Sequence, residues 1–194
     1  MPLRLALFGG SFDPPHLAHL GIAGAAVEQC ALDRVTFIPC QVSPLKGRTP
    51  GASGPQRAEM LRLATEGLPW AAVSEWELAR PGPSYSWQTA RHFSAEFPGA
   101  ELFWLMGEDQ WRALDQWANP DYLREHLTFI VFGRDGWTPQ FRPEWRAHFL
   151  AGTWAGSSTE ARALLAGGKS ASHLLTPAVE AYAVRHRLYT PGDQ

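Results

Sequence analysis

The stretch GGSFDPPHLAHL, from Gly9 to Leu20, leaves an apolar run through two glycines, turns at two prolines and enters a region of helical spacing. Glycines let a ligand approach the backbone closely, and the free N–H groups at a helix N-terminus favour an anion. His16 and His19 stand three residues apart, so they share one face at the helix start and add N–H donors. We therefore predict a phosphate-binding turn at this point of the chain.

Each part of this stretch has a simpler interpretation. Two glycines can form a plain turn, and a lone histidine is more often an ordinary surface or core residue. A zinc site is a weaker alternative, because His16 and His19 supply two ligands and no Cys pair or HExxH sequence lies nearby. The combined pattern favours the phosphate site over these interpretations.

Outward from this stretch, short apolar runs alternate with longer segments of helical spacing. We expect strands at residues 3–8, 34–38, 102–106 and 127–132, with weaker strands at 72–77 and 152–155. We expect helices at residues 17–30, 55–66, 86–96, 109–123, 159–166 and 177–187. This alternation predicts the α/β class: a single Rossmann-like, doubly wound, mostly parallel sheet with helices on both faces, in one domain of residues 1–194.

Composition narrows the class of protein. With 194 residues and 45% hydrophobic content, the chain is long enough to close one apolar core. A net charge of -2 without a basic cluster argues against nucleic acid as a partner. Cys30 and Cys40 form no CxxC pair, and the apolar run at residues 3–8 is too short to cross a membrane, so we expect a cytoplasmic protein with no membrane partner. The oligomeric state stays open, a homo-oligomer included.

The segment from Ser43 to Pro55 is rich in Pro, Gly and Ser and is typical of a long loop. Long loops inside compact domains are often lids or ligand loops. It is therefore a candidate functional segment.

GGSFDPPHLAHL resembles the GG(T/S)FDPxHxGH signature of the nicotinate mononucleotide adenylyltransferases, within the HxGH nucleotidyltransferase superfamily. The resemblance continues in order along the chain. The matching residues are Ile38-Pro39 with Ser43-Pro44-Leu45-Lys46 (the family's IP…PPHK), Arg57 with Met60-Leu61 (RxxML), Gly82 with Ser84-Tyr85-Ser86 (GxSYT), Leu105-Met106-Gly107-Glu108-Asp109 ((I/M)GxD), Trp117, Arg134 (RxG), Ser157-Ser158-Thr159 with Arg162 (SSTxIR), and the ending Tyr182 to Tyr189 (the family's last helix). The first signature alone indicates the superfamily, and the ordered set indicates its nicotinate branch.

Some positions depart from the family pattern. Ala18 replaces the Gly of HxGH, a change between small residues that leaves both histidines in place. Leu45 stands where the family usually has His before Lys46, and this removes one phosphate donor from the loop. Ser86 for Thr and Ala161 for Ile are mild changes.

The resemblance implies an enzyme that transfers the adenylyl group of ATP, with Mg²⁺, to nicotinate mononucleotide, giving deamido-NAD and pyrophosphate in NAD biosynthesis. The attack is expected to be direct and in line. The residues implied to be catalytic are His16, His19, Lys46 and Arg162. Those implied to bind ATP are Gly9, Gly10, Ser11, Phe12, Gly107, Asp109, Ser157, Ser158 and Thr159. Those implied to bind the nicotinate nucleotide are Ser84, Tyr85, Ser86, Trp117 and Arg134, and no protein metal site is expected.

Several of these residues also have a purely structural interpretation. Ser157 before Glu160 is typical of a helix N-cap, and capping is compatible with phosphate binding. Trp117 is one of nine tryptophans, most of which must be packing residues.

Two other functions stay open. One is adenylyl transfer to another acceptor, such as nicotinamide mononucleotide, phosphopantetheine or a flavin. The other is a non-catalytic nucleotide-binding sensor, for which Leu45 is the one hint.

Overall fold

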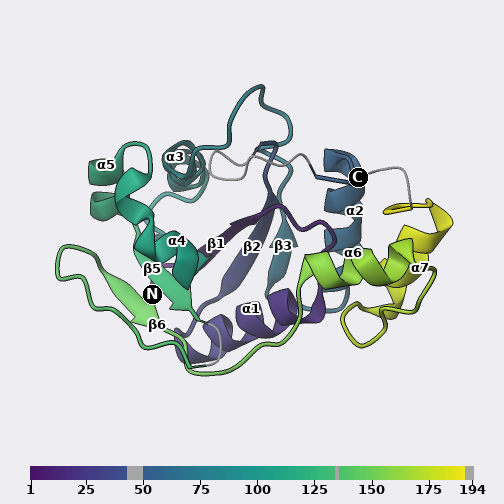
Figure 1. The fold of residues 1–194 in the computed structure, drawn as a ribbon. Coiled ribbons are helices and arrows are strands. Elements are labelled where there is room, and N and C mark those ends of the chain that lie inside the picture. The colour runs from purple at the N-terminus through teal and green to yellow at the C-terminus, as the bar shows by residue number, and fades with distance from the viewer. Residues whose placement is uncertain (43–49, 134–135, 191–194) are drawn as a thin grey trace.

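The computed structural model describes residues 1–42, 50–133 and 136–190 (Figure 1). Six strands form one sheet in the order β3-β2-β1-β4-β5-β6, and every neighbouring pair is parallel. The strands are β1 (Arg4–Gly10), β2 (Arg34–Pro39), β3 (Ala71–Val73), β4 (Glu101–Gly107), β5 (Thr128–Phe132) and β6 (Ala147–Phe149). This is the strand order of a doubly wound sheet, so the predicted fold class is confirmed.

Helices connect the strands and close the chain. They are α1 (Leu17–Gln29), α2 (Gly54–Thr65), α3 (Ser86–Glu96), α4 (Glu108–Arg112), the 3₁₀ turn η1 (Leu114–Gln116), α5 (Pro120–His126), α6 (Ser158–Ala166) and α7 (Pro177–Arg185). None of the helices in the described part of the chain combines the length and the apolar character that crossing a membrane requires.

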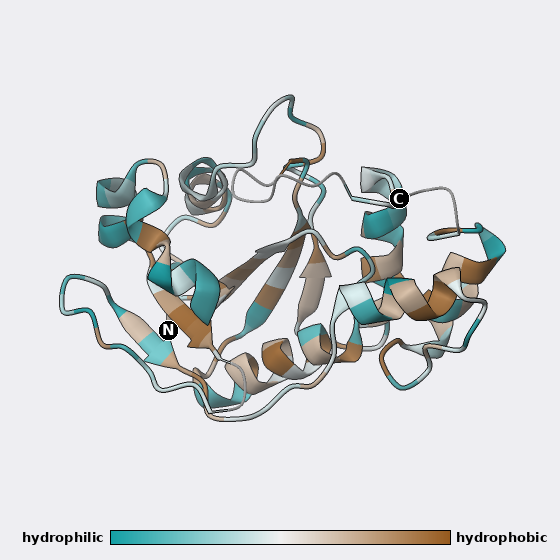
Figure 2. Ribbon diagram, viewed as in Figure 1, coloured by the Kyte–Doolittle hydropathy of each residue, from teal (hydrophilic) through white to brown (hydrophobic). Residues whose placement is uncertain are grey.

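The apolar core lies on both faces of the sheet, because successive residues of a strand point in opposite directions. On one face, Leu5 and Leu7 pack in a buried cluster with residues of α3, α4 and α5. On the other, Ala6 and Phe8 pack with residues of α1. Figure 2 shows apolar residues along the strands and on helices such as α1 that pack against them. Both faces of the sheet are thus covered, as is usual for a parallel sheet.

The order of the strands places a crevice at the carboxyl end of β1. The chain leaves β1 toward β2 and β3 on one side, whereas β4, β5 and β6 lie on the other. At this reversal the connecting segments diverge, and ligands of such sheets bind in the opening. The Gly9-Gly10 pair ends β1 at this point.

The helix predicted at residues 109–123 is wrong in extent. The structure divides it into α4, η1 and α5. Asn119 adopts a left-handed conformation with φ of 54°, and Pro120 starts α5 because it has no N–H to continue the preceding turn. Between η1 and α5 the backbone is extended at Trp117.

The weaker strand predictions were only partly right. Residues 152–155 do not form a strand; Gly152 has φ of 147°, and β5 pairs instead with β6, in register Phe129 to Ala147. The strand expected at 72–77 ends at Val73, and the chain beyond it brings Glu77 to the crevice. The predicted helices at 17–30, 55–66, 86–96, 159–166 and 177–187 are confirmed to within one or two residues.

Truncation of a core residue tests this packing. Leu105 on β4 is fully buried, so we expect Leu105→Ala to lower the free energy of unfolding by roughly 2–5 kcal/mol. Phe141 is exposed, and Phe141→Ala should stay within about 0.5 kcal/mol of the wild type. Urea denaturation of both variants measures the difference; similar losses in the two would contradict this core.

Candidate active site

The turn after β1 is compact because the side chain of Phe12 packs into the core. Phe12, with φ of 48°, is buried and packs edge-on against Phe8, Phe37 and His19. A Cβ at Gly10 would lie 3.0 Å from this ring, so glycine is needed for the ring to pack there. The side chain of Phe12 is therefore part of the core, and only its backbone is able to meet a ligand.

The two histidines meet at the start of α1. Their rings are stacked, with centroids 3.7 Å apart and an interplanar angle of 24°. The backbone N–H of His16 donates to Nδ1 of His19 at 3.1 Å. This hydrogen bond makes Nδ1 the acceptor nitrogen of His19, so its neutral ring carries the proton on Nε2.

His16 is the more deeply placed of the two. Its side chain is buried, with 8% of the residue exposed, and burial lowers the pKa of His16 from 6.5 to about 4. Its Nδ1 is buried without a hydrogen-bond partner in the described structure. At neutral pH this ring is uncharged and able to donate or accept one hydrogen bond.

The N-terminus of α6 lies against the same turn. The Ser157 hydroxyl accepts from the N–H of Glu160 at 3.1 Å, which is the predicted N-cap. The Ser158 hydroxyl donates to the carbonyl of Pro14 at 2.9 Å, and Arg162 donates to the carbonyl of Asp13 at 2.6 Å. These contacts join segments far apart in the sequence and leave a cationic group beside the histidines.

A cavity of about 540 Å³ lies over this turn and continues to the ends of β4 and β5. All of the residues predicted to bind ATP line it, together with His16, His19 and Arg162. The sequence reasoning missed further lining residues, among them Asp13, Phe132 and Trp154. A helix N-terminus, an arginine and two imidazoles make one end of the cavity suited to phosphate groups.

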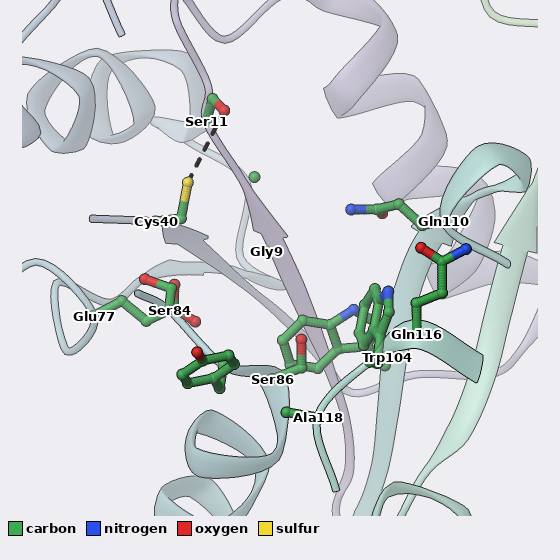
Figure 3. Close-up of a pocket in the computed structure, with 13 residues that line it drawn as sticks. Gly9, Ser11, Cys40, Glu77, Ser84, Ser86, Trp104, Gln110, Gln116 and Ala118 are labelled. Carbon is green, nitrogen blue, oxygen red and sulfur yellow. Dashed lines mark hydrogen bonds between the residues drawn. The ribbon is translucent and has the colours of Figure 1, made fainter. Parts of the chain in front are cut away.

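A smaller cavity, of about 190 Å³, lies on the other side of β1 (Figure 3). Predicted acceptor residues Ser84, Tyr85, Ser86 and Trp117 line it, and Trp117 meets Trp104 edge-on at 5.9 Å. Its described lining contains no Lys, Arg or His. Within the described lining, the donors available to a negatively charged ligand group are neutral, such as backbone N–H groups and side-chain amides.

Glu77 is an unpredicted member of this smaller cavity. It is 5% exposed, and its Oε1 accepts from the Thr89 hydroxyl at 2.6 Å. Burial raises the pKa of Glu77, whereas hydrogen bonds from Thr89 and Ser84 oppose that shift. Glu77 and Ser84 lie side by side in Figure 3, so the carboxyl group is in place to hold the turn before α3. One glutamate among nineteen acidic residues offered no sequence signal for this position.

The two cavities meet at the end of β1. Gly9, Gly10, Ser11 and Gln110 line both. Figure 3 shows Gln110 and Gln116 extending toward the cavity from the side of α4 and η1. A ligand in one cavity would thus lie next to a ligand in the other.

Two predicted site residues, Lys46 and Arg134, lie outside the described residues, as do Ser43 and Leu45. The Cys40 thiol lies 3.9 Å from the Ser11 hydroxyl in the wall of the smaller cavity.

The described residues contain no group of three or more His, Cys, Asp or Glu side chains arranged to hold a metal ion. The Asp13 carboxylate at the larger cavity already accepts hydrogen bonds from Gly51, Ala52 and Tyr189. The described residues therefore offer few ligands to a metal ion, which fits a divalent ion held mainly by the phosphates of a ligand and by water.

Fold and site together define an α/β protein with a doubly wound sheet and a cavity lined by two stacked histidines, an arginine and a helix N-terminus. Residues 7–164 match the model of the cytidylyltransferase-like family. The probable nicotinate-nucleotide adenylyltransferase of Methylacidiphilum infernorum is 38% identical over 97% of this chain and 93% of its own length. The protein of that name from Thermus thermophilus is 39% identical over 96% of this chain and all of its own. The chain therefore belongs to the nicotinate-nucleotide adenylyltransferase family of cytidylyltransferase-like proteins.

A solved structure has the same fold. The nicotinic acid mononucleotide adenylyltransferase of Plasmodium falciparum, complexed with NaAD, superposes with a TM-score of 0.78 at 16% identity. The superposition covers 96% of this chain and 97% of that one.

The buried state of His16 predicts a pH-dependent stability. The pKa of His16 in the folded state lies below its value in the unfolded state. Its contribution to the free energy of unfolding is therefore complete above pH 6.5 and is lost as the pH falls toward 4. We expect the free energy of unfolding to fall by up to about 3 kcal/mol more in the wild type than in His16→Gln over this window. Urea denaturation at pH 7 and about pH 4.5 measures it; parallel pH curves for the two proteins would contradict the assignment.

Proposed function

We propose that the protein transfers the adenylyl group of ATP to nicotinate mononucleotide, forming deamido-NAD and pyrophosphate, in NAD biosynthesis. The main support for this proposal is the pair of cavities that meet at Gly9, Gly10 and Ser11. The larger cavity is lined by a guanidinium and two imidazoles, and the described lining of the smaller one has neither group. The names of the relatives support the same reaction. The proposal takes residues 1–194 as one nucleotidyltransferase domain.

ATP occupies the larger cavity in this proposal. Its triphosphate lies where the N-terminus of α6, Arg162 and the two histidines converge. Its adenosine extends toward Asp109 and Trp154 at the other side of the cavity, where a carboxylate and an indole are able to bind ribose hydroxyls and stack on a base. Lys46, outside the described residues, is proposed as a further phosphate ligand.

The nicotinate nucleotide occupies the smaller cavity. Trp117 stacks on its pyridine ring, and the first N–H groups of α3, at the Ser84 to Ser86 turn, donate to its carboxylate. N–H donors at this turn can pair with both oxygens of a carboxylate, whereas the amino group of a carboxamide is itself a donor and does not pair with them, which is the basis for preferring acid over amide. Arg134 is proposed as a further contact of this nucleotide.

The reaction follows from this placement. A phosphate oxygen of the mononucleotide attacks the α-phosphorus of ATP, the bond from that phosphorus to the bridging oxygen breaks, and pyrophosphate leaves on the opposite side. His16 and His19 donate hydrogen bonds to the α-phosphate oxygens as charge develops, and Arg162 holds the leaving phosphates. Catalysis thus consists of positioning and charge stabilisation, without a covalent enzyme intermediate. Mg²⁺ bound by the phosphates would neutralise part of their charge.

Pyrophosphate release tests the proposed reaction. With ATP and Mg²⁺, we expect rapid release with nicotinate mononucleotide and much slower release with nicotinamide mononucleotide or phosphopantetheine. His19→Ala should lower kcat about a hundredfold or more, because it removes a donor to the transition state. His173→Ala, an exposed histidine outside both cavities, is the matched control.

The outcomes separate the alternatives. Equal rates with nicotinamide mononucleotide would contradict only the preference of the pocket for the acid. Pyrophosphate release with phosphopantetheine and with neither pyridine nucleotide would show that phosphopantetheine is the acceptor. No release with any acceptor, from a folded protein that binds ATP, would favour a nucleotide sensor.

Two tryptophans test the assignment of the cavities. Trp117 lines only the smaller cavity and Trp154 only the larger. Loss of a stacking face costs about 1–3 kcal/mol, so Trp117→Ala should raise KM for nicotinate mononucleotide roughly tenfold and leave KM for ATP nearly unchanged. Trp154→Ala should do the reverse. Steady-state kinetics with each substrate varied in turn provides the measurement, and an exchanged pattern would reverse the assignment.

A further inference from the structure

A buried carboxylate supports the phosphate end of the larger cavity. Asp13 is 4% exposed and stands three residues before His16. Its Oδ1 accepts from the Tyr189 hydroxyl at 2.9 Å and from the Ala52 N–H at 3.0 Å, and its Oδ2 accepts from the Gly51 N–H at 2.8 Å. Three neutral donors therefore satisfy this carboxylate.

The Tyr189 donor comes from the segment that follows α7. Tyr189 is 2% exposed and has φ of 65°, a conformation that a bulky residue adopts only when its surroundings fix it. A Cβ on Gly51 would lie 3.2 Å from its ring, so the ring covers that backbone closely. Burial, followed by the nearby Asp13 charge, raises the pKa of Tyr189, so its hydroxyl keeps its proton.

Asp13 also binds Arg162, through its backbone carbonyl oxygen. The guanidinium Nη1 donates to the Asp13 carbonyl at 2.6 Å, whereas the same nitrogen lies 3.8 Å from Oδ2 of the carboxylate. The Thr159 hydroxyl accepts from Nη2 at 3.1 Å. A carboxylate that lost one of its neutral donors would attract this guanidinium more strongly, and Arg162 would be drawn away from a phosphate in the cavity.

We propose that Tyr189 is a positioning residue for the triphosphate of ATP: its hydroxyl occupies the Asp13 carboxylate, so that Arg162 stays directed at the phosphates. This inference rests on the proposed function. Asp13 and Arg162 line the larger cavity and not the smaller, so the effect is specific to ATP. The segment after α7 thereby becomes part of the active site's support.

Tyr189→Phe removes the hydroxyl and keeps the ring. We expect kcat/KM for ATP to fall about tenfold, as for a lost hydrogen bond to a charged group, and KM for nicotinate mononucleotide to change less than about twofold. Tyr182→Phe is the control, because Tyr182 lies on α7, packs on His186 and lines neither cavity. Its kinetics should match the wild type.

A double-mutant cycle tests the route through Arg162. In an Arg162→Ala background, Tyr189→Phe should cause little further loss, because the group through which it acts is gone. Full additivity of the two losses would overturn the route. An unchanged kcat/KM for ATP in Tyr189→Phe would overturn the proposal, as would equal losses for both substrates with a lower melting temperature, which indicate a purely structural role.

Equilibrium ATP binding, followed by tryptophan fluorescence, separates this inference from the proposed function. If the wild type released no pyrophosphate, the proposed reaction would fail, yet Tyr189→Phe should still weaken ATP binding about tenfold. Wild-type turnover with unchanged ATP affinity in Tyr189→Phe would leave the reaction intact and reject the role of Tyr189.

Discussion

Two hydrogen bonds between the β1–α1 turn and α6 are the constraint on which the larger cavity depends. They run from Ser158 to the carbonyl of Pro14 and from Arg162 to the carbonyl of Asp13. Each uses a backbone oxygen of the turn as its acceptor, so the N-termini of α1 and α6 are brought to one place. This end of the cavity exists because a hydrogen bond between residues 144 positions apart in the chain brings the start of α6 to the turn before α1.

The distribution of charge divides the site into two halves. The larger cavity is lined by Arg162 and the paired imidazoles as well as by carboxylates, whereas the described lining of the smaller one has a buried carboxyl group and no cation. A triphosphate needs positive groups and N–H donors. A pyridinium ring with a carboxylate is nearly neutral and is served by aromatic faces and N–H groups. The glycines between the halves leave the backbone open to groups from both cavities.

Much of the fold was predictable because its elements are locally encoded. The helix at 86–96 has the predicted ends, and the turn before α1 follows from glycines, prolines and histidines within one short stretch. One error lies where apolar periodicity continues past a local helix breaker, and another where a strand is defined by its neighbour. Residues 109–123 have helical spacing throughout, yet Asn119 and Pro120 break the helix. The last strand is so short that its pairing with β5 alone defines it.

By itself, the sequence determined the strand and helix alternation, the turn after the first strand and the order of the motifs, because each depends on residues close together in the chain. It also marked out many of the residues that line each cavity, through the family motifs. Only the tertiary structure decided that Tyr189 meets Asp13, that Glu77 meets Thr89 in the smaller cavity, and that His16 is buried enough to remain uncharged. These depend on desolvation and on packing between distant segments, which no local pattern encodes.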